Sequence, residues 1–156
     1  ATLTTEKVFE AFLGRYEEMK TFFYGHSYCA NPLGCAAALG SLQVFEEEGV
    51  LEQLPAKVEF LGRIVRAAAA DCRHWGEVRH LGMIVGIDLV DPDSNGPLDW
   101  KAETGARVCR VARQYGLLTR PVRDTLTLMP PLCVSEDQIQ GAVDALVKAT
   151  ADVLGE

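Results

Sequence analysis

The chain has 156 residues, of which 48% are hydrophobic and 24% are charged. This length suits about one domain, and the composition is typical of a globular domain rather than of a disordered chain. The formal net charge of −7 would repel a phosphate backbone, which argues against nucleic acid as a partner. The sequence shows neither an apolar run of membrane-spanning length nor the features of a secretory signal. We therefore expect a cytoplasmic location, with no membrane partner.

Three helices are expected in the first third to half of the chain. Residues 5–13 have a helical apolar face behind a short polar start. The pair Asn31–Pro32 is typical of a helix start and should begin a helix over residues 33–48. Residues 50–73 carry apolar side chains at spacings of three and four, which predicts a long amphipathic helix. Pro55 would lie in its first turn or interrupt it.

The second half mixes strands and helices. Residues 78–90 are β-branched and almost continuously apolar, which predicts one buried strand. A helix over 99–115 and a hairpin of strands at 117–122 and 125–129 should follow. A capping-box pattern predicts a terminal helix over 135–155. The fold class expected is α+β, with helices covering a small, mainly antiparallel sheet.

The five cysteines show no CxxC pair and no histidine partner at metal-ligand spacing. We interpret them as small buried side chains in a reducing compartment, with a structural disulfide or a zinc site as the alternatives. They are Cys29, Cys35, Cys72, Cys109 and Cys133.

Two places could bind an anion. Gly25, His26 and Ser27 stand shortly before a capped helix, where a hydroxyl and backbone amides suit a phosphate, although spacing alone favours a tight turn whose serine bonds its own backbone. A packing role for His26 is preferred to acid–base chemistry, because no partner stands at a fixed offset. Arg120 lies in an apolar segment and should have an anionic partner, either a substrate carboxylate or an internal Asp or Glu.

The remaining histidines, His74 and His80, are expected at the surface of the protein, together with the acidic run at residues 46–48. None of these residues stands in a pattern that indicates a reaction.

Several segments resemble one protein family. Residues 24–38 (YGHSYCANPLGCAAA) closely resemble the loop and helix that follow the catalytic lysine in class III pyridoxal-phosphate aminotransferases. Residues 118–121 (LTRP) and 126–131 (LTLMPP) resemble the C-terminal strand pair of that family, and residues 78–88 resemble its VRxxGxxxGxxL strand. The resemblance runs from residue 1 to the end, in family order.

The resemblance implies the C-terminal portion of a fold type I enzyme. Residues 1–49 would be the end of the large, pyridoxal-phosphate-binding domain, and residues 50–156 the small α+β domain. The implied reaction belongs to biotin biosynthesis and moves an amino group from S-adenosylmethionine to 8-amino-7-oxononanoate. The alternative within the family is a transaminase of other ω-amino acids, such as ornithine or 4-aminobutyrate.

The resemblance also implies roles for individual residues. Gly25, His26 and Ser27 match the loop that, in a homodimer, reaches the cofactor phosphate of the other subunit. Arg120 matches the arginine that binds the substrate carboxylate. Thr127 stands where such enzymes can carry an aromatic residue near the substrate.

In the family, the lysine that binds the cofactor lies upstream of the part that resembles this chain. None of the five lysines here matches its context, so no catalytic residue is assigned and we expect the chain to be inactive alone. It begins with Ala rather than Met, which favours a fragment of a longer enzyme. A split subunit and a non-catalytic dimerisation or binding module remain as alternatives.

Overall fold

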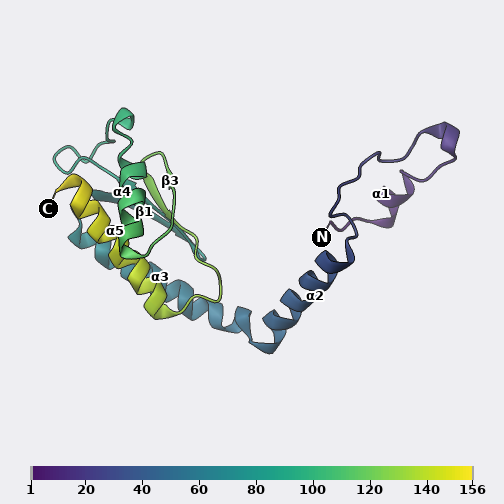
Figure 1. Ribbon diagram of the computed structural model, residues 1–156, viewed down its shortest axis with the longest axis horizontal. Helices are drawn as coiled ribbons and strands as arrows, with labels where there is room; N and C mark the ends of the chain where they lie inside the picture. Colours follow the sequence, from purple (N-terminus) through teal and green to yellow (C-terminus); the bar gives the residue numbers. More distant parts are fainter. Residues whose placement is uncertain (1, 156) are drawn as a thin grey trace. The chain divides into compact units, whose positions relative to one another are not determined.

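The computed structural model describes residues 2–155, which divide between Gln43 and Val44 into an N-terminal unit and a C-terminal unit. Figure 1 shows the helices and strands of each unit. The two units are described separately below. None of the helices within residues 2–155 combines the length and the apolar character that crossing a membrane requires.

The N-terminal unit contains α1 (Glu6–Glu10), the 3-10 turn η1 (Tyr16–Glu18) and most of α2 (Pro32–Glu47). The helix α1 is shorter than predicted, because the side chain of Thr5 makes no capping hydrogen bond and none of its residues is buried. The start of α2 is confirmed. Asn31 Oδ1 accepts a hydrogen bond from the Gly34 amide at 3.1 Å, and Pro32 is the first helical residue.

The C-terminal unit has three α-helices: α3 (Val50–Asp71), α4 (Thr104–Ala112) and α5 (Glu136–Leu154). The long amphipathic α3 is confirmed, and Pro55 lies inside it without ending it. The capping box of α5 is also confirmed. Ser135 Oγ accepts a hydrogen bond from the Gln138 amide at 3.2 Å, and Gln138 Oε1 accepts one from the Ser135 amide at 2.9 Å.

The four strands of this unit form one antiparallel sheet in the order β1-β2-β4-β3. The prediction of a single strand over residues 78–90 is wrong. Gly82 has φ +57° and turns the chain tightly, so that Leu81 pairs with Ile84 across a hairpin. The strands are β1 (Trp75–Leu81), β2 (Ile84–Leu89), β3 (Pro121–Val122) and β4 (Thr125–Leu128).

Two further predictions need correction. The helix expected over 99–115 is broken into η2 (Trp100–Ala102), α4 and η3 (Arg113–Tyr115), since Glu103 takes a left-handed conformation with φ 49°. The strand expected over 117–122 is reduced to the two residues of β3, which pairs with β4 at the edge of the sheet. The hairpin of β3 and β4 is confirmed.

The hydrophobic core lies between one face of the sheet and the three helices, and Figure 1 shows α3, α4 and α5 gathered beside the strands. The predicted α+β class is therefore confirmed. The opposite face of the sheet is more polar and carries Arg79, Asp88 and Thr125. The largest fully buried side chains are Leu61, Val65, Val85, Ile87, Val108, Leu126, Ile139, Val143, Leu146 and Thr150.

Candidate functional site

A groove of about 890 Å³ opens in the C-terminal unit beside the β3–β4 hairpin. Its walls come from α3, from the segment between η3 and β3, from the end of β4 and the connection after it, and from the first turns of α5. Most of the side chains around it are apolar, and its cationic groups are Arg113 and Arg120. Such a groove suits a ligand with an apolar chain and an anionic end.

Arg120 is exposed at this groove, directly before β3. No ion pair joins its guanidinium to a carboxylate within residues 2–155. In the described part of the chain, Arg120 therefore has no internal Asp or Glu as an ion-pair partner. An exposed, unpaired guanidinium remains able to form a bidentate contact with a carboxylate from outside.

Thr127 in β4 lies at the same groove and contacts Arg120 directly. Its hydroxyl donates a hydrogen bond to the main-chain carbonyl of Arg120 at 2.5 Å. The hydroxyl of Thr119 donates in the other direction, to the carbonyl of Thr127 at 2.6 Å. The structure thus brings together Arg120 and Thr127, the two residues expected at the substrate, and adds Thr119, which the sequence analysis missed.

The loop of Gly25, His26 and Ser27 lies in the N-terminal unit and is exposed. His26 shapes this turn: its Nδ1 accepts a hydrogen bond from the Tyr28 amide at 3.2 Å, and the two rings stack with centroids 5.4 Å apart. The His26 carbonyl accepts a further bond from the Cys29 amide at 2.8 Å. These contacts agree with the packing interpretation of His26.

The Ser27 hydroxyl and the space beside Gly25 are both open to a ligand. In the part of the chain that the structure describes, the Ser27 hydroxyl makes no hydrogen bond, and a side chain built on Gly25 would meet nothing within 4 Å. Asn31, by contrast, is already engaged in capping α2. A phosphate would therefore find the Ser27 hydroxyl and the loop backbone available, which fits the chemistry expected of this loop.

The sequence analysis also missed a charged network on the outer face of the sheet. Arg79 donates two hydrogen bonds to Asp88, at 2.6 and 2.5 Å, and the Thr125 hydroxyl donates a third at 2.6 Å. The hydrogen bond from the Arg79 guanidinium holds the pKa of the Asp88 carboxyl below its usual value, and the bond from Thr125 adds to this effect. Partial burial acts in the opposite direction. Recognising Gly82 as a hairpin turn would have predicted that Arg79 and Asp88 lie on neighbouring strands.

The prediction that His74 lies at the surface is wrong, because only 7% of its surface is exposed. Its carbonyl accepts a hydrogen bond from the Val90 amide at 2.9 Å, which holds it under the end of β2. His80 is half-buried, and its Nε2 lies 2.8 Å from the Gly82 carbonyl.

The cysteines also differ from expectation. Cys72 and Cys109 are buried, but Cys29, Cys35 and Cys133 are exposed. Burial raises the pKa of the Cys109 thiol to about 11. Residues 2–155 contain no group of three or more His, Cys, Asp or Glu side chains placed to hold a metal ion.

None of the lysines in residues 2–155 lines the groove. Three of them have other contacts: Lys20 pairs with Glu18 at 3.5 Å, Lys57 Nζ donates to the Leu132 carbonyl at 2.9 Å, and Lys148 lies over the Tyr115 ring.

Comparison with known proteins decides the family. Residues 1–150 match the model of the class III aminotransferases. The chain belongs to this family.

Two curated relatives of this family show how similar the chain is to individual enzymes. The chain is 43% identical over 156 residues to the adenosylmethionine-8-amino-7-oxononanoate aminotransferase of Geobacter sulfurreducens, a match that covers 99% of this chain and 34% of that protein. It is 31% identical to an omega-aminotransferase of Caulobacter vibrioides, over 100% of this chain and 33% of that protein. This class III chain spans about a third of the length of the curated relatives it matches.

The fold agrees with a solved structure of the same family. The crystal structure of the adenosylmethionine-8-amino-7-oxononanoate aminotransferase from Methanocaldococcus jannaschii superposes with a TM-score of 0.85 at 34% identity. The superposition covers 96% of this chain and 34% of that one.

Proposed function

We propose that this chain is the C-terminal part of a pyridoxal-phosphate-dependent aminotransferase of biotin biosynthesis. The reaction proposed transfers an amino group from S-adenosylmethionine to 8-amino-7-oxononanoate. The observation that carries the proposal is Arg120, an unpaired guanidinium at a largely apolar groove. The acceptor has a matching form, because its carboxylate stands at the end of an aliphatic chain. The adenosylmethionine-8-amino-7-oxononanoate aminotransferases among the relatives support this choice of substrates.

Under this proposal the two parts of the chain have different tasks. Residues 1–49 form the end of the large domain, and residues 50–156 form the small domain, which binds the acceptor through Arg120. The arrangement of the C-terminal unit supports the second task, because the groove and Arg120 both lie within it.

Pyridoxal phosphate is the cofactor expected of a class III enzyme, and it would supply an electron sink for moving the amino group. Ser27 and the backbone of the loop would bind its phosphate, while His26 keeps the loop in shape through its contact with Tyr28. The lysine that this chemistry requires would come from outside these 156 residues. The sequence context supports this, since none of the five lysines stands in a segment that resembles the family's catalytic lysine turn.

The proposed active form is a homodimer in which the loop of Gly25, His26 and Ser27 reaches the cofactor phosphate of the other subunit. The apolar side chains exposed in the N-terminal unit leave surface both for such a contact and for the rest of the same subunit, since this chain spans about a third of its relatives' length. Leu33 and Leu39 on α2 are 82% and 68% exposed, and Phe22 and Tyr28 in the loop are 67% and 79% exposed. In the complete enzyme, either subunit could supply the protein that covers them.

A second candidate is a transaminase of other ω-amino acids. Thr127 favours it, because this position can carry an aromatic residue in the biotin-pathway enzymes, and the relative from Caulobacter vibrioides has such an activity in its name. Assaying the complete enzyme with 8-amino-7-oxononanoate, and separately with ornithine and 4-aminobutyrate as donors, distinguishes the two. A higher kcat/KM in the second assay would favour this candidate.

The proposal is tested in the complete enzyme that contains this chain. Arg120→Ala should raise KM for 8-amino-7-oxononanoate about 10- to 100-fold, because hydrogen bonds to a charged group are lost. Arg107→Ala is the matched control, since Arg107 is exposed on α4 and does not line the groove. An unchanged kcat/KM in Arg120→Ala would refute the carboxylate-binding role.

The source of the lysine has its own test. This chain alone, mixed with pyridoxal phosphate, should show no stoichiometric absorption band of lysine-bound cofactor at about 410–430 nm. A band of full intensity, traced to one of the five lysines by reduction and mass spectrometry, would contradict the proposal.

A further inference from the structure

Arg120 reaches the groove from the position directly before β3, at the end of the ladder between β3 and β4. The ladder between β3 and β4 pairs Val122 with Thr125 and Pro121 with Leu126, and it ends there. Because this ladder is two residue pairs long, further hydrogen bonds decide how firmly the main chain of Arg120 is attached to β4.

Two threonine hydroxyls supply this attachment. Thr127 Oγ1 donates to the Arg120 carbonyl at 2.5 Å, and Thr119 Oγ1 donates to the Thr127 carbonyl at 2.6 Å. Within the described residues, these are the side-chain hydrogen bonds that join residues 119–120 to β4. We call Thr119 and Thr127 together the threonine clamp.

The clamp is attached to a rigid part of the sheet. Leu126 and Leu128, on either side of Thr127, are 0% and 5% exposed and belong to the hydrophobic core. β4 also pairs with β2, where Gly86 stands opposite Thr127. A group bonded to Thr127 is thus held to a strand whose neighbouring side chains are buried in the hydrophobic core.

The same geometry defines what Thr127 can do. A hydroxyl has one hydrogen to donate, and that of Thr127 points to the Arg120 carbonyl. It cannot donate to a substrate at the same time. Thr127 can therefore act on the substrate through Arg120 instead of by direct donation.

We propose that the threonine clamp positions Arg120, so that its guanidinium meets the substrate carboxylate in a fixed place. The proposal rests on the carboxylate-binding role of Arg120 proposed above. Thr119 and Thr127 are then positioning residues whose hydroxyls, rather than their size, determine how well the acceptor binds.

The experiment uses the complete enzyme and variants that change only the hydroxyl. Thr127→Val and Thr119→Val keep the shape of the side chain and remove its donor. Each should raise KM for 8-amino-7-oxononanoate about 5- to 10-fold with kcat nearly unchanged, which corresponds to the loss of one hydrogen bond. Thr127→Ser and Thr119→Ser retain the donor and should restore the KM of the wild type.

A second substrate separates positioning from general damage. The corresponding amino ketone without the carboxylate cannot contact Arg120, so its KM should be equal in the wild type and in both valine variants. Thr125→Val is the matched control on the same strand, because its hydroxyl bonds Asp88 and not the Arg120 segment. It should leave both KM values unchanged.

Each result has a distinct meaning. Arg120→Ala is measured first, and an unchanged KM there refutes the proposed function itself. If Arg120→Ala raises KM but both valine variants behave as the wild type, the clamp is refuted and the function stands. An equal rise in KM for the carboxylate-free substrate, or in Thr125→Val, also refutes the clamp, because the loss would then be structural. If Thr127→Val does not fold, Thr119→Val decides the question alone.

Discussion

The helices α2 and α5 are similar in length, with 16 and 19 residues, yet they have opposite surroundings. α5 buries six residues against the core of the C-terminal unit, whereas α2 buries none. Both begin at a well-formed cap, Ser135 for α5 and Asn31 for α2. Capping is a local property of the sequence, whereas burial depends on what packs against the helix.

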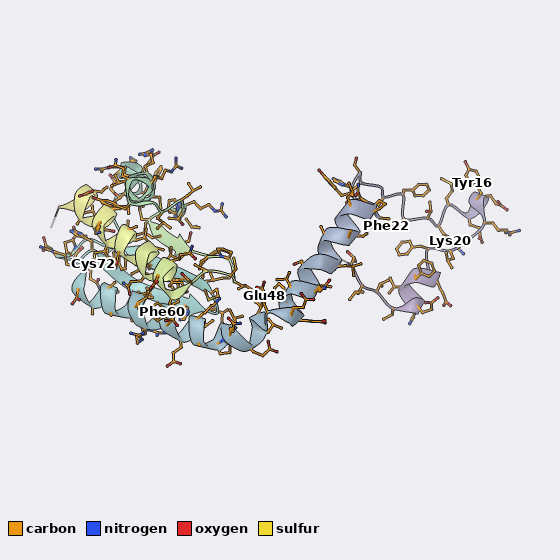
Figure 2. The ribbon with its side chains drawn as sticks, turned by 60° about the horizontal axis from the view of Figure 1, so that its bottom comes forward. Tyr16, Lys20, Phe22, Glu48, Phe60 and Cys72 are labelled. Atoms are coloured by element: carbon orange, nitrogen blue, oxygen red, sulfur yellow. The ribbon has the colours of Figure 1, made fainter. Side chains whose placement is uncertain are left out.

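The same contrast holds for the two units. Every described residue of the N-terminal unit is exposed apart from the half-buried Asn31, and Figure 2 shows Tyr16 and Phe22 projecting from its loop. The core of the whole chain lies in the C-terminal unit. The stability of this chain should therefore depend on the C-terminal unit, and paired substitutions can test that difference.

The largest effect is expected from removing a core side chain. Leu61→Ala in α3 should reduce the free energy of unfolding by about 2–5 kcal/mol, because Leu61 is completely buried and its removal leaves a cavity. Leu39→Ala in α2, where Leu39 is 68% exposed, should change it by less than about 0.5 kcal/mol. Urea unfolding of the chain measures both. Equal losses would mean that α2 is packed within the chain.

A smaller effect is expected at glycine positions. An alanine side chain at Gly105 would clash with the Arg123 carbonyl and crowd Pro121, so Gly105→Ala should cost about 1–3 kcal/mol. Gly40→Ala meets nothing within 4 Å and should be neutral or slightly stabilising. Thermal unfolding compares the two variants. A destabilised Gly40→Ala would reveal a neighbour that closely approaches α2.

The helix caps give the third comparison. Ser135→Ala should reduce the free energy of unfolding by about 1 kcal/mol, since it removes one half of the capping box of α5. Thr5→Ala should have no measurable effect, because the Thr5 side chain makes no capping bond to α1. Circular dichroism during urea unfolding reports both. A loss in Thr5→Ala as large as that in Ser135→Ala would contradict the comparison.

The smallest effect is expected from Asp88 and depends on pH. The folded protein lowers the pKa of Asp88, so the carboxylate stabilises the fold at neutral pH, above its unfolded pKa of about 3.9. That contribution is lost as the pH falls through the lower, folded pKa. Asp88→Asn should therefore be slightly less stable than the wild type at pH 7, with the difference vanishing in acid.

Urea midpoints at a series of pH values between neutral and about pH 3 measure this difference. Glu17→Gln is the control in the N-terminal unit, because it removes only an exposed ion pair with Arg15, at 3.7 Å. It should not change the midpoint at any pH. A difference for Asp88→Asn that grows toward acid would show that the sign is wrong.

Local signals predicted several elements correctly. Asn31–Pro32 and Ser135 with Gln138 mark helix starts through contacts between residues three apart, so their sequence neighbours suffice to recognise them. The spacing of apolar residues in α3 likewise identified a helix and its buried side.

The wrong or missing predictions concern contacts between residues that are distant in sequence. Gly82 lies inside the apolar run at 78–90, and whether it bends one strand or begins a hairpin depends on how β1 and β2 pair. The burial of His74 follows from its position beside Val90, sixteen residues later by number. Of the candidate site, Arg120 was predicted from its place in an apolar segment and from its match to a family motif, while Thr119 was missed because its bond to Thr127 exists only once the hairpin has formed.

The sequence alone determined the family, the α+β class and the helix caps, because motifs and short-range hydrogen bonds depend on neighbouring residues. Only the tertiary structure decided which apolar residues are covered, how the strands are divided and which groups hold Arg120. The physical reason is that burial and strand pairing are contacts between distant residues. A chain with 48% hydrophobic residues has enough of them for a core, but folding decides that this core lies in the C-terminal unit.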